Sequence, residues 1–351
     1  MAENNKKKNL RWMILSLLLG IVSFSIFFMQ GEISENISAL AKIDLNWLFA
    51  AFGLAFFVWF FEALTIHMTA KMVSLPLSVG ESFNVTMVGQ FYNSITPFAS
   101  GGQPMQIHRL YKLGKDVSKS SAVMVSRFII YQSTITVIGV IVLALFFRNF
   151  KTDIPGFTAL ALLGFSINSF VIVFLLLFSF SPKMTRGIFR FVIWFCSKFR
   201  FGKKIEQGAD NIYHKLEEFH DSMRYLKDHP FKLLVAFIYT FAQVVLYFSI
   251  PYCIYKMFGN NSVSYIEIFS FQGILFLIIS FFPVPGGSGA AETGFFLFFK
   301  QFFLSSDLAG AVLIWRLISY YLNIIAGVLF VIFKKKNISG DELPTKIPKE
   351  N

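Results

Sequence analysis

The sequence is poor in charged residues and in cysteine. Charged side chains make up 15% of its 351 residues and hydrophobic side chains 55%, whereas soluble globular proteins carry about 25% charged residues. Its two cysteines, Cys196 and Cys253, match neither a zinc site nor a disulfide framework. Gly-x-Ser-x-Gly, Walker A and clustered Cys/His motifs are also missing. These deficits exclude a water-soluble enzyme, and we expect no metal or other cofactor.

The hydrophobic residues form runs long enough to cross a lipid bilayer. A transmembrane helix needs about 20 apolar residues, and six segments reach that length. They are residues 12–30, 45–67, 120–147, 157–180, 231–257 and 308–333. The sequence therefore predicts an all-α, polytopic membrane protein with about six transmembrane helices.

The net charge of +12 is concentrated in short loops and at the termini. This distribution is typical of the positive-inside rule rather than of a nucleic-acid-binding surface, so we expect no nucleic-acid partner. Three lysines, residues 6–8, precede a first apolar run that is too long for a signal peptide and has no cleavage site after it. With that end in the cytoplasm, alternation places both termini and the basic stretch 183–229 inside.

Two further apolar stretches, residues 83–105 and 265–304, are interrupted at their centres. The sequences PFASGGQP at 97–104 and PVPGGSG at 283–289 break helices there. Non-helical backbone at membrane depth must be buried in protein or line a wet cavity. We therefore interpret both stretches as re-entrant helical hairpins, the first entering from the cytoplasm and the second from outside. The second stretch is also long enough for two complete spans, and that alternative stays open.

A short repeat follows each interruption. The sequences AVMVSRFIIY at 122–131 and AVLIWRLISY at 311–320 share Ala, Val, Arg, Ile and Tyr. The two copies run in opposite directions in this topology, which indicates an inverted 3+3 repeat like that of many secondary transporters. Chance similarity between apolar segments is the alternative. The expected units are the first repeat at 1–150, the fourth span at 151–182, a linker at 183–230, the rest of the second repeat at 231–336 and a disordered tail at 337–351.

The linker is polar and basic. Its apolar residues Ile205, Ile212, Leu216, Phe219 and Met223 recur at helical spacing. This pattern predicts an amphipathic helix on the inner leaflet. A simple connection between the two halves is the plainer interpretation.

Four ionisable residues fall within the predicted membrane region: Glu62, Arg127, Glu292 and Arg316. Such residues usually face the bundle interior and mark functional pathways. Their depths allow two pairs, Glu62 with Arg127 and Glu292 with Arg316. In one interpretation these ion pairs lock helices together. In the other, the arginines hold an anionic headgroup, because the guanidinium fork matches phosphate oxygens.

The glycine-rich turns offer a second way to bind phosphate. Glycine permits positive φ, and backbone N–H groups at the start of a helix attract anions. The plainer interpretation of the glycines is tight packing at the turns. His108 and Arg109, after the first turn, can equally be anchors at the membrane interface. The further candidate substrate-binding residues are Gly101, Gly102, Gln103, His108, Arg109, Gly286, Gly287 and Ser288.

Residues 283–292, PVPGGSGAAE, resemble the P-x-P-G-G-x-G-x-x-E signature of the lysylphosphatidylglycerol synthase transmembrane-region family. Residues 97–109 are similar to the family's first conserved block, and the resemblance covers residues 10–335. It implies a flippase-like protein of the bacterial cytoplasmic (inner) membrane. The family includes the membrane half of the multiple peptide resistance factor. In such full-length members a soluble domain makes lysylphosphatidylglycerol and the membrane domain moves it outward, which repels cationic antimicrobial peptides.

Only a short polar tail follows Phe333, so we do not expect the transferase activity to accompany the resemblance. Our leading hypothesis is a protein that translocates or binds a phospholipid, such as an aminoacylated phosphatidylglycerol, or a lipid-linked substrate. One alternative is a membrane-embedded lipid-modifying transferase, such as a phosphatidylglycerol lysyltransferase. Another is an accessory subunit that binds a lipid-modifying enzyme as its partner.

Overall fold

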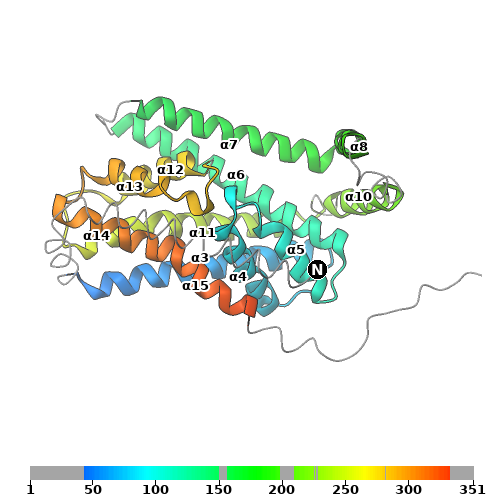
Figure 1. Cartoon of the computed structure of the whole chain (residues 1–351), viewed down its shortest axis with the longest axis horizontal. Helices are drawn as coiled ribbons and strands as arrows, with labels where there is room; N and C mark the ends of the chain where they lie inside the picture. The colour runs from blue at the N-terminus through cyan, green and yellow to red at the C-terminus, as the bar shows by residue number, and fades with distance from the viewer. Residues whose placement is uncertain are drawn as a thin grey trace, which may run out of the picture.

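The computed structural model describes residues 43–149, 156–197, 209–224, 226, 228–280 and 282–332, and every regular element among them is a helix. Five helices within these ranges are long and apolar enough to cross a membrane, so the all-α polytopic fold is confirmed. The expected span at 12–30 and the tail at 337–351 lie outside the described residues. The five long helices are α3 (Leu45–Met72), α6 (Val117–Asn149), α7 (Phe157–Phe180), α11 (Pro230–Met257) and the composite helix Ser305–Ile332 (Figure 1).

The composite helix contains an irregular turn next to one of the buried arginines. It consists of α14 (Ser305–Arg316), a single π-helical turn η3 (Leu317–Tyr321) and α15 (Leu322–Ile332). Such π turns are rare inside α-helices and are frequent at functional sites. The turn begins at the residue that follows Arg316.

Two helical hairpins lie between the long helices. The first comprises α4 (Val79–Ile95), the short turn η1 (Pro97–Ala99) and α5 (Gly102–Lys112). The second comprises α12 (Tyr265–Ile279), η2 (Pro285–Gly287) and α13 (Ala290–Phe299). Figure 1 shows that they occupy opposite ends of the bundle, and the turns η1 and η2 contact each other.

The arms of these hairpins are too short to cross a bilayer. The longest arm, α4, has 17 residues and the shortest, α13, has 10, which corresponds to about 25 and 15 Å of helix. The hydrocarbon core is about 30 Å thick. The geometry therefore favours hairpins over two complete spans in the second stretch, and their insertion into a bilayer stays a prediction.

Both hairpins begin with the same local signal. Ser78 accepts a hydrogen bond from the backbone N–H of Glu81, and the Glu81 carboxylate accepts one from the backbone N–H of Ser78. Ser264 likewise accepts from the backbone N–H of Glu267 at the start of α12. These caps satisfy N–H groups that a helix terminus otherwise leaves unpaired. Each first arm therefore starts at a defined residue.

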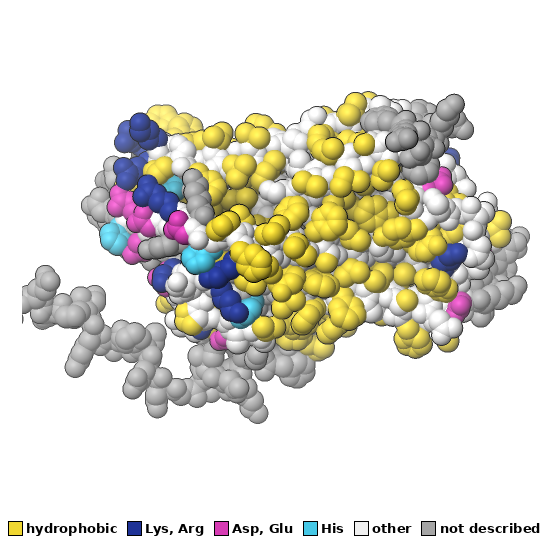
Figure 2. Space-filling model, turned by 180° about the vertical axis from the view of Figure 1, so that it is seen from behind, with side chains coloured by type: hydrophobic (Ala, Val, Ile, Leu, Met, Phe, Trp, Pro, Cys, Tyr) yellow, Lys and Arg dark blue, Asp and Glu magenta, His cyan; other side chains and the backbone are white. Residues whose placement is uncertain are grey.

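The exterior is apolar along the spans and charged at one end. Figure 2 shows a broad hydrophobic band, with most charges gathered at the end that carries α8 (Pro182–Ser197) and α10 (Ala209–Arg224). On α7, Leu163 and Phe170 are 57% and 69% exposed. Exposed leucine and phenylalanine over a whole span suit contact with lipid acyl chains. The direction in which the bundle crosses the membrane stays a prediction.

The described part of the linker contains two helices, α8 and α10, and α10 carries the predicted apolar face. Leu216, Phe219 and Met223 of α10 are buried, and α10 packs against α6 and α7. At these three residues the apolar face of α10 is therefore covered by protein rather than by lipid. Helical periodicity identifies an apolar face but not the surface that covers it. Ile205 and the side chain of Ile212 lie outside the part of the chain that the structure describes.

Candidate functional site

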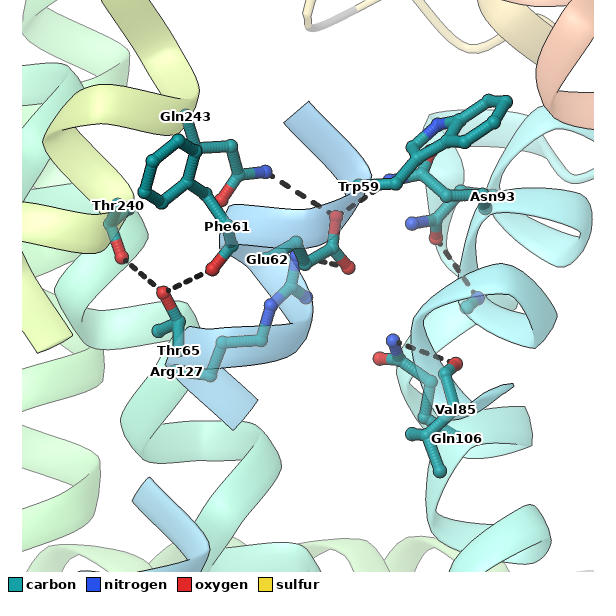
Figure 3. A network of polar contacts seen from close by, with 12 residues as sticks. Trp59, Phe61, Glu62, Thr65, Val85, Asn93, Gln106, Arg127, Thr240 and Gln243 are labelled. Carbon is teal, nitrogen blue, oxygen red and sulfur yellow. Dashed lines mark hydrogen bonds and ion pairs between the residues drawn. The ribbon is translucent and has the colours of Figure 1, made fainter. Parts of the chain in front are cut away.

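The first buried charge pair joins α3 to α6. Arg127 Nη2 lies 2.7 Å from Glu62 Oε1, and Glu62 is 0% exposed. Gln90 of α4 and Gln243 of α11 donate hydrogen bonds from Nε2 to Glu62 Oε2, at 2.6 and 3.3 Å. Figure 3 shows Arg127 and Gln243 reaching Glu62 from different helices. We call Glu62, Gln90, Gln106, Arg127 and Gln243 the Glu62 cluster.

The Glu62 cluster keeps hydrogen-bonding capacity that the protein does not use. Among the described residues, Arg127 Nε and Nη1 have no hydrogen-bond or ion-pair partner. Gln106 Nε2 donates to the Val85 carbonyl at 3.3 Å, whereas its Oε1 is buried without a partner in the same part of the chain. In Figure 3 the Gln106 amide faces the Glu62–Arg127 pair. The cluster therefore presents free donors and a free acceptor to the same region.

The second buried charge pair closes the second hairpin. Arg316 Nε lies 2.8 Å from Glu292 Oε1. Its Nη1 donates to the Gly286 carbonyl at 3.0 Å, and its Nη2 donates to Ser288 Oγ at 3.2 Å. The guanidinium carbon lies 4.4 Å from the centre of the Tyr320 ring. We call Gly286, Ser288, Glu292, Arg316 and Tyr320 the Arg316 cluster.

All three guanidinium nitrogens of Arg316 thus bind protein groups, in contrast to those of Arg127. The other oxygen of Glu292, Oε2, accepts the backbone N–H of Gly289 at 2.7 Å, which caps α13. A carboxylate in the first turn also complements the helix dipole. Both predicted ion pairs form, and the Arg316–Glu292 pair holds the second turn in place.

The two hairpin turns share one backbone conformation. In each turn an extended residue precedes a proline, and the two residues after the proline have positive φ. Phe98 has φ 55° and ψ 18°, and Gly286 has φ 60° and ψ 14°. The serine that follows donates from Oγ to the proline carbonyl in both turns, at 2.9 and 3.0 Å. The turns are therefore structurally equivalent.

The equivalent residues of the two turns are not the two Gly-Gly pairs. The residues with positive φ in the first turn are Phe98 and Ala99, not the glycine pair. Gly101 has φ −82° and precedes α5, which begins at Gly102. A side chain on Gly102 would overlap Asn93. This glycine is required for close packing rather than for a left-handed backbone.

The backbone N–H groups proposed to bind phosphate already have partners. Gly101 N donates to Thr96 Oγ1 at 2.9 Å, and Gly102 N donates to Asn93 Oδ1 at 3.0 Å. In the second turn, the N–H groups of residues 287–289 bond to Val284, Pro285 and Glu292. In this conformation the turns offer few free donors, whereas Arg127 keeps guanidinium nitrogens without a partner among the described residues.

Three further candidates lie on α5, outside both clusters. Arg109 Nε donates to Asn84 Oδ1 at 2.6 Å and so links the two arms of the first hairpin. Partial burial, with a smaller contribution from nearby Lys112, lowers the pKa of His108 below its ordinary value. Its imidazole is therefore mostly neutral at pH 7 and adds no cation. Gln103 is half-buried.

Gln106 belongs to the polar stripe that the sequence predicts after the first turn, whereas Gln90 and Gln243 of the Glu62 cluster were not among the predicted candidates. A neutral amide carries no charge signal, and glutamine is common on helix surfaces. The available signal was their position within apolar stretches, where polar side chains usually face other helices.

A tyrosine joins the Arg316 cluster to the first hairpin. The Tyr320 hydroxyl donates to the Ser94 carbonyl at the end of α4, at 3.2 Å. The Arg316 cluster therefore contacts the first hairpin directly, close to where the turns η1 and η2 meet.

The sequence model of one protein family, described as the lysylphosphatidylglycerol synthase TM region, matches residues 13–327. The chain belongs to this family. A UPF0104 membrane protein of Archaeoglobus fulgidus is 26% identical over 329 residues, covering 91% of this chain and 95% of the relative. A UPF0104 membrane protein of Methanothermobacter thermautotrophicus is 25% identical, covering 92% and 96%. An uncharacterized protein of Mycoplasma genitalium is 25% identical, covering 91% and 87%.

Family membership confirms the resemblance found in the sequence. The matched range includes both hairpins and both clusters. Membership and the apolar helices together establish a multi-pass membrane protein. Several of the relatives are archaeal, so location in a bacterial inner membrane stays a prediction, as does a cytoplasmic position of both termini.

Proposed function

We propose that the protein binds the headgroup of a phospholipid or lipid-linked substrate at the Glu62 cluster and moves it between leaflets. The observation that carries this proposal is the unused hydrogen-bonding capacity of Arg127 beside a buried carboxylate. Burying a charge is costly unless hydrogen bonds satisfy it. At Arg316, by comparison, two nitrogens donate hydrogen bonds to protein and Nε forms the ion pair with Glu292. Arg127 lacks such contacts among the described residues.

The cluster matches a headgroup that carries both an anion and a hydrogen-bond donor. The free Nε and Nη1 of Arg127 suit two oxygens of a phosphate. Glu62 and Gln106 Oε1 suit a hydroxyl or ammonium group. An aminoacylated phosphatidylglycerol, the lipid class in the family's description, offers both groups. Arg316 then acts indirectly, because it holds the turn of the second hairpin.

The arrangement of the hairpins supports a path across the bilayer. They come from opposite ends of the bundle, and their turns contact each other (Figure 1). Broken helices of this kind line binding sites near the midplane of many transporters. In the proposed path the headgroup passes the polar region where the turns meet, and the acyl chains stay against the apolar exterior.

Leaflet exchange in liposomes tests the proposal. The purified chain is reconstituted with fluorescent phosphatidylglycerol, and a membrane-impermeant quencher reports the rate at which inner-leaflet lipid appears outside. A hydrogen bond to a charged group contributes about 1.5–3 kcal/mol. Arg127→Ala is therefore expected to slow exchange by about 10- to 150-fold. The matched control is Arg224→Ala, because Arg224 forms an exposed pair with Asp221 on α10, and it is expected to retain the wild-type rate.

A second variant separates function from folding. Arg127→Lys keeps a cation beside Glu62 but removes the guanidinium fork. We expect it to fold, as judged by size-exclusion chromatography, and to exchange lipid more slowly than the wild type. Wild-type exchange by folded Arg127→Ala and Arg127→Lys would refute the proposal. Product formation from phosphatidylglycerol without any leaflet exchange would replace it with a lipid-modifying enzyme.

A further inference from the structure

Helix α8 starts at the end of a membrane span and turns sharply away from it. Only Ser181 separates the last residue of α7, Phe180, from Pro182. In Figure 1, α7 runs across the view whereas α8 is seen nearly along its axis, at the end of the bundle. Helix α7 has 24 residues, about 36 Å of helix, which is enough to cross the hydrocarbon core of a bilayer. A helix that starts two residues after such a span and turns away from it is placed to run along the bilayer surface.

Hydrogen bonds fix this corner. Thr185 Oγ1 donates to the Phe178 carbonyl at 2.6 Å, and the backbone N–H of Thr185 donates to the Ser181 carbonyl at 3.1 Å. Proline at the first helical position costs no hydrogen bond, because that N–H is unpaired in any helix. The depth and direction of α8 are therefore set by its connection to α7.

The outward side of α8 combines aromatic and cationic residues. Phe191, Trp194 and Phe195 are each more than half exposed. Their rings are neighbours, with centroids of Phe191 and Trp194 5.8 Å apart and those of Phe191 and Phe195 6.4 Å apart. Lys183 and Arg190, both exposed, lie seven residues apart and so on one stripe of the helix. An exposed aromatic face next to a cationic stripe is typical of helices that lie in the membrane interface.

The charge of α8 also distinguishes it from α10. The exposed Arg186 pairs with Glu217 of α10 at 2.6 Å. Lys183 and Arg190 have no acidic partner among the described residues. In α10, by contrast, the apolar face is covered by α6 and α7. Two cations without counterions beside exposed aromatic rings favour an anionic lipid surface over a protein partner.

We infer that α8 lies in the headgroup region of one leaflet and binds anionic phospholipids there. The rings of Phe191, Trp194 and Phe195 sit at the boundary with the acyl chains, and Lys183 and Arg190 contact phosphate-bearing headgroups. The site is separate from the Glu62 cluster, which holds one headgroup within the bundle. Helix α8 thereby concentrates anionic lipid at the end of the bundle where the first hairpin lies.

The experiment uses the full chain in nanodiscs of phosphatidylcholine, with or without phosphatidylglycerol. A spin label at Phe191→Cys, in a Cys196→Ser background, reports depth through its accessibility to oxygen and to a water-soluble nickel chelate. We expect the label to be accessible to oxygen and protected from the chelate. A label at Asp221→Cys, on an exposed part of α10, is expected to be fully accessible to the chelate. Equal chelate accessibility at both positions would overturn the inference.

Lipid preference supplies the second measurement. Spin-labelled phosphatidylglycerol and phosphatidylcholine report the relative association of each lipid with the protein. Each cation near a membrane surface changes anionic lipid binding by about fivefold. Lys183→Gln/Arg190→Gln removes two cations and is therefore expected to reduce the preference for phosphatidylglycerol by up to about 25-fold. The matched control is Lys256→Gln/Lys300→Gln, and an equal effect of both double variants would also overturn the inference. Neither readout depends on leaflet exchange.

Discussion

Replacing Gly286 by alanine tests how the second turn is held in place. Gly286 has φ 60°, and a Cβ added to it would overlap the ring of Tyr320. That ring stacks on the Arg316 guanidinium, 4.4 Å from its centre, and its hydroxyl donates to the Ser94 carbonyl at 3.2 Å. The ring cannot move away without weakening both contacts. The substitution is therefore expected to disturb the Arg316 cluster and the link to the first hairpin.

The expected cost has two parts. Left-handed backbone costs alanine about 1 kcal/mol, and overpacking costs about 1–3 kcal/mol. Gly286→Ala is therefore expected to lower the free energy of unfolding by about 2–4 kcal/mol. Gly287→Ala is the matched control, because Gly287 has φ 63° but a Cβ there meets neighbours only at 3.7 and 3.9 Å. The first turn already carries Ala99 at that position, so we expect a cost of about 1 kcal/mol.

Equilibrium unfolding in mixed micelles with increasing sodium dodecyl sulfate measures these free energies. Tryptophan fluorescence reports the transition, since Trp315 stacks against Phe295 beside the second turn. The wild type is expected to be most stable, followed by Gly287→Ala and then Gly286→Ala. Equal losses for the two alanine variants would refute the reasoning, because only the contact with Tyr320 distinguishes them.

Three further substitutions probe the buried contacts. Arg127→Gln alone leaves the Glu62 carboxylate buried without a cation and is expected to lower the free energy of unfolding by about 3–5 kcal/mol. Adding Glu62→Gln is expected to recover most of this loss. A double variant less stable than Arg127→Gln would contradict the expectation. Tyr320→Phe removes one hydroxyl hydrogen bond and is expected to cost about 1 kcal/mol in the same unfolding assay, with Tyr320→Ala costing clearly more. Gly102→Ala places a Cβ against the Asn93 side-chain amide, which accepts a hydrogen bond from the first N–H of α5. A Cβ at Gly80 meets nothing within 4 Å, so only Gly102→Ala is expected to lower the melting temperature.

The spans could be predicted because the thickness of a bilayer fixes the length of an apolar run. The expected spans at 157–180 and 231–257 match α7 and α11 within one residue. The hairpins were predictable because prolines and glycines interrupt two apolar stretches. The two charge pairs followed from depth alone, since a buried arginine requires a carboxylate nearby.

The equivalence of the two turns could not be predicted from residue types. Phe98 and Ala99 adopt a conformation that usually favours glycine, so an alignment based on glycine places the wrong residues together. From the sequence alone, Arg127 and Arg316 are equal candidates for binding an anionic headgroup. Their difference depends on which groups surround each guanidinium, and those groups come from distant helices and from backbone carbonyls. Such contacts leave no local pattern in the sequence.

Contact between a lipid headgroup and the Glu62 cluster is the central claim, and photo-cross-linking tests it most directly. A phospholipid with a photoreactive headgroup is incorporated into membranes that contain the full chain, and cross-linked peptides are identified by mass spectrometry. We predict cross-links in α3 and α6 around Glu62 and Arg127 that are lost in Arg127→Lys. Cross-links confined to the lipid-facing side of α7, and unchanged in that variant, would contradict the account.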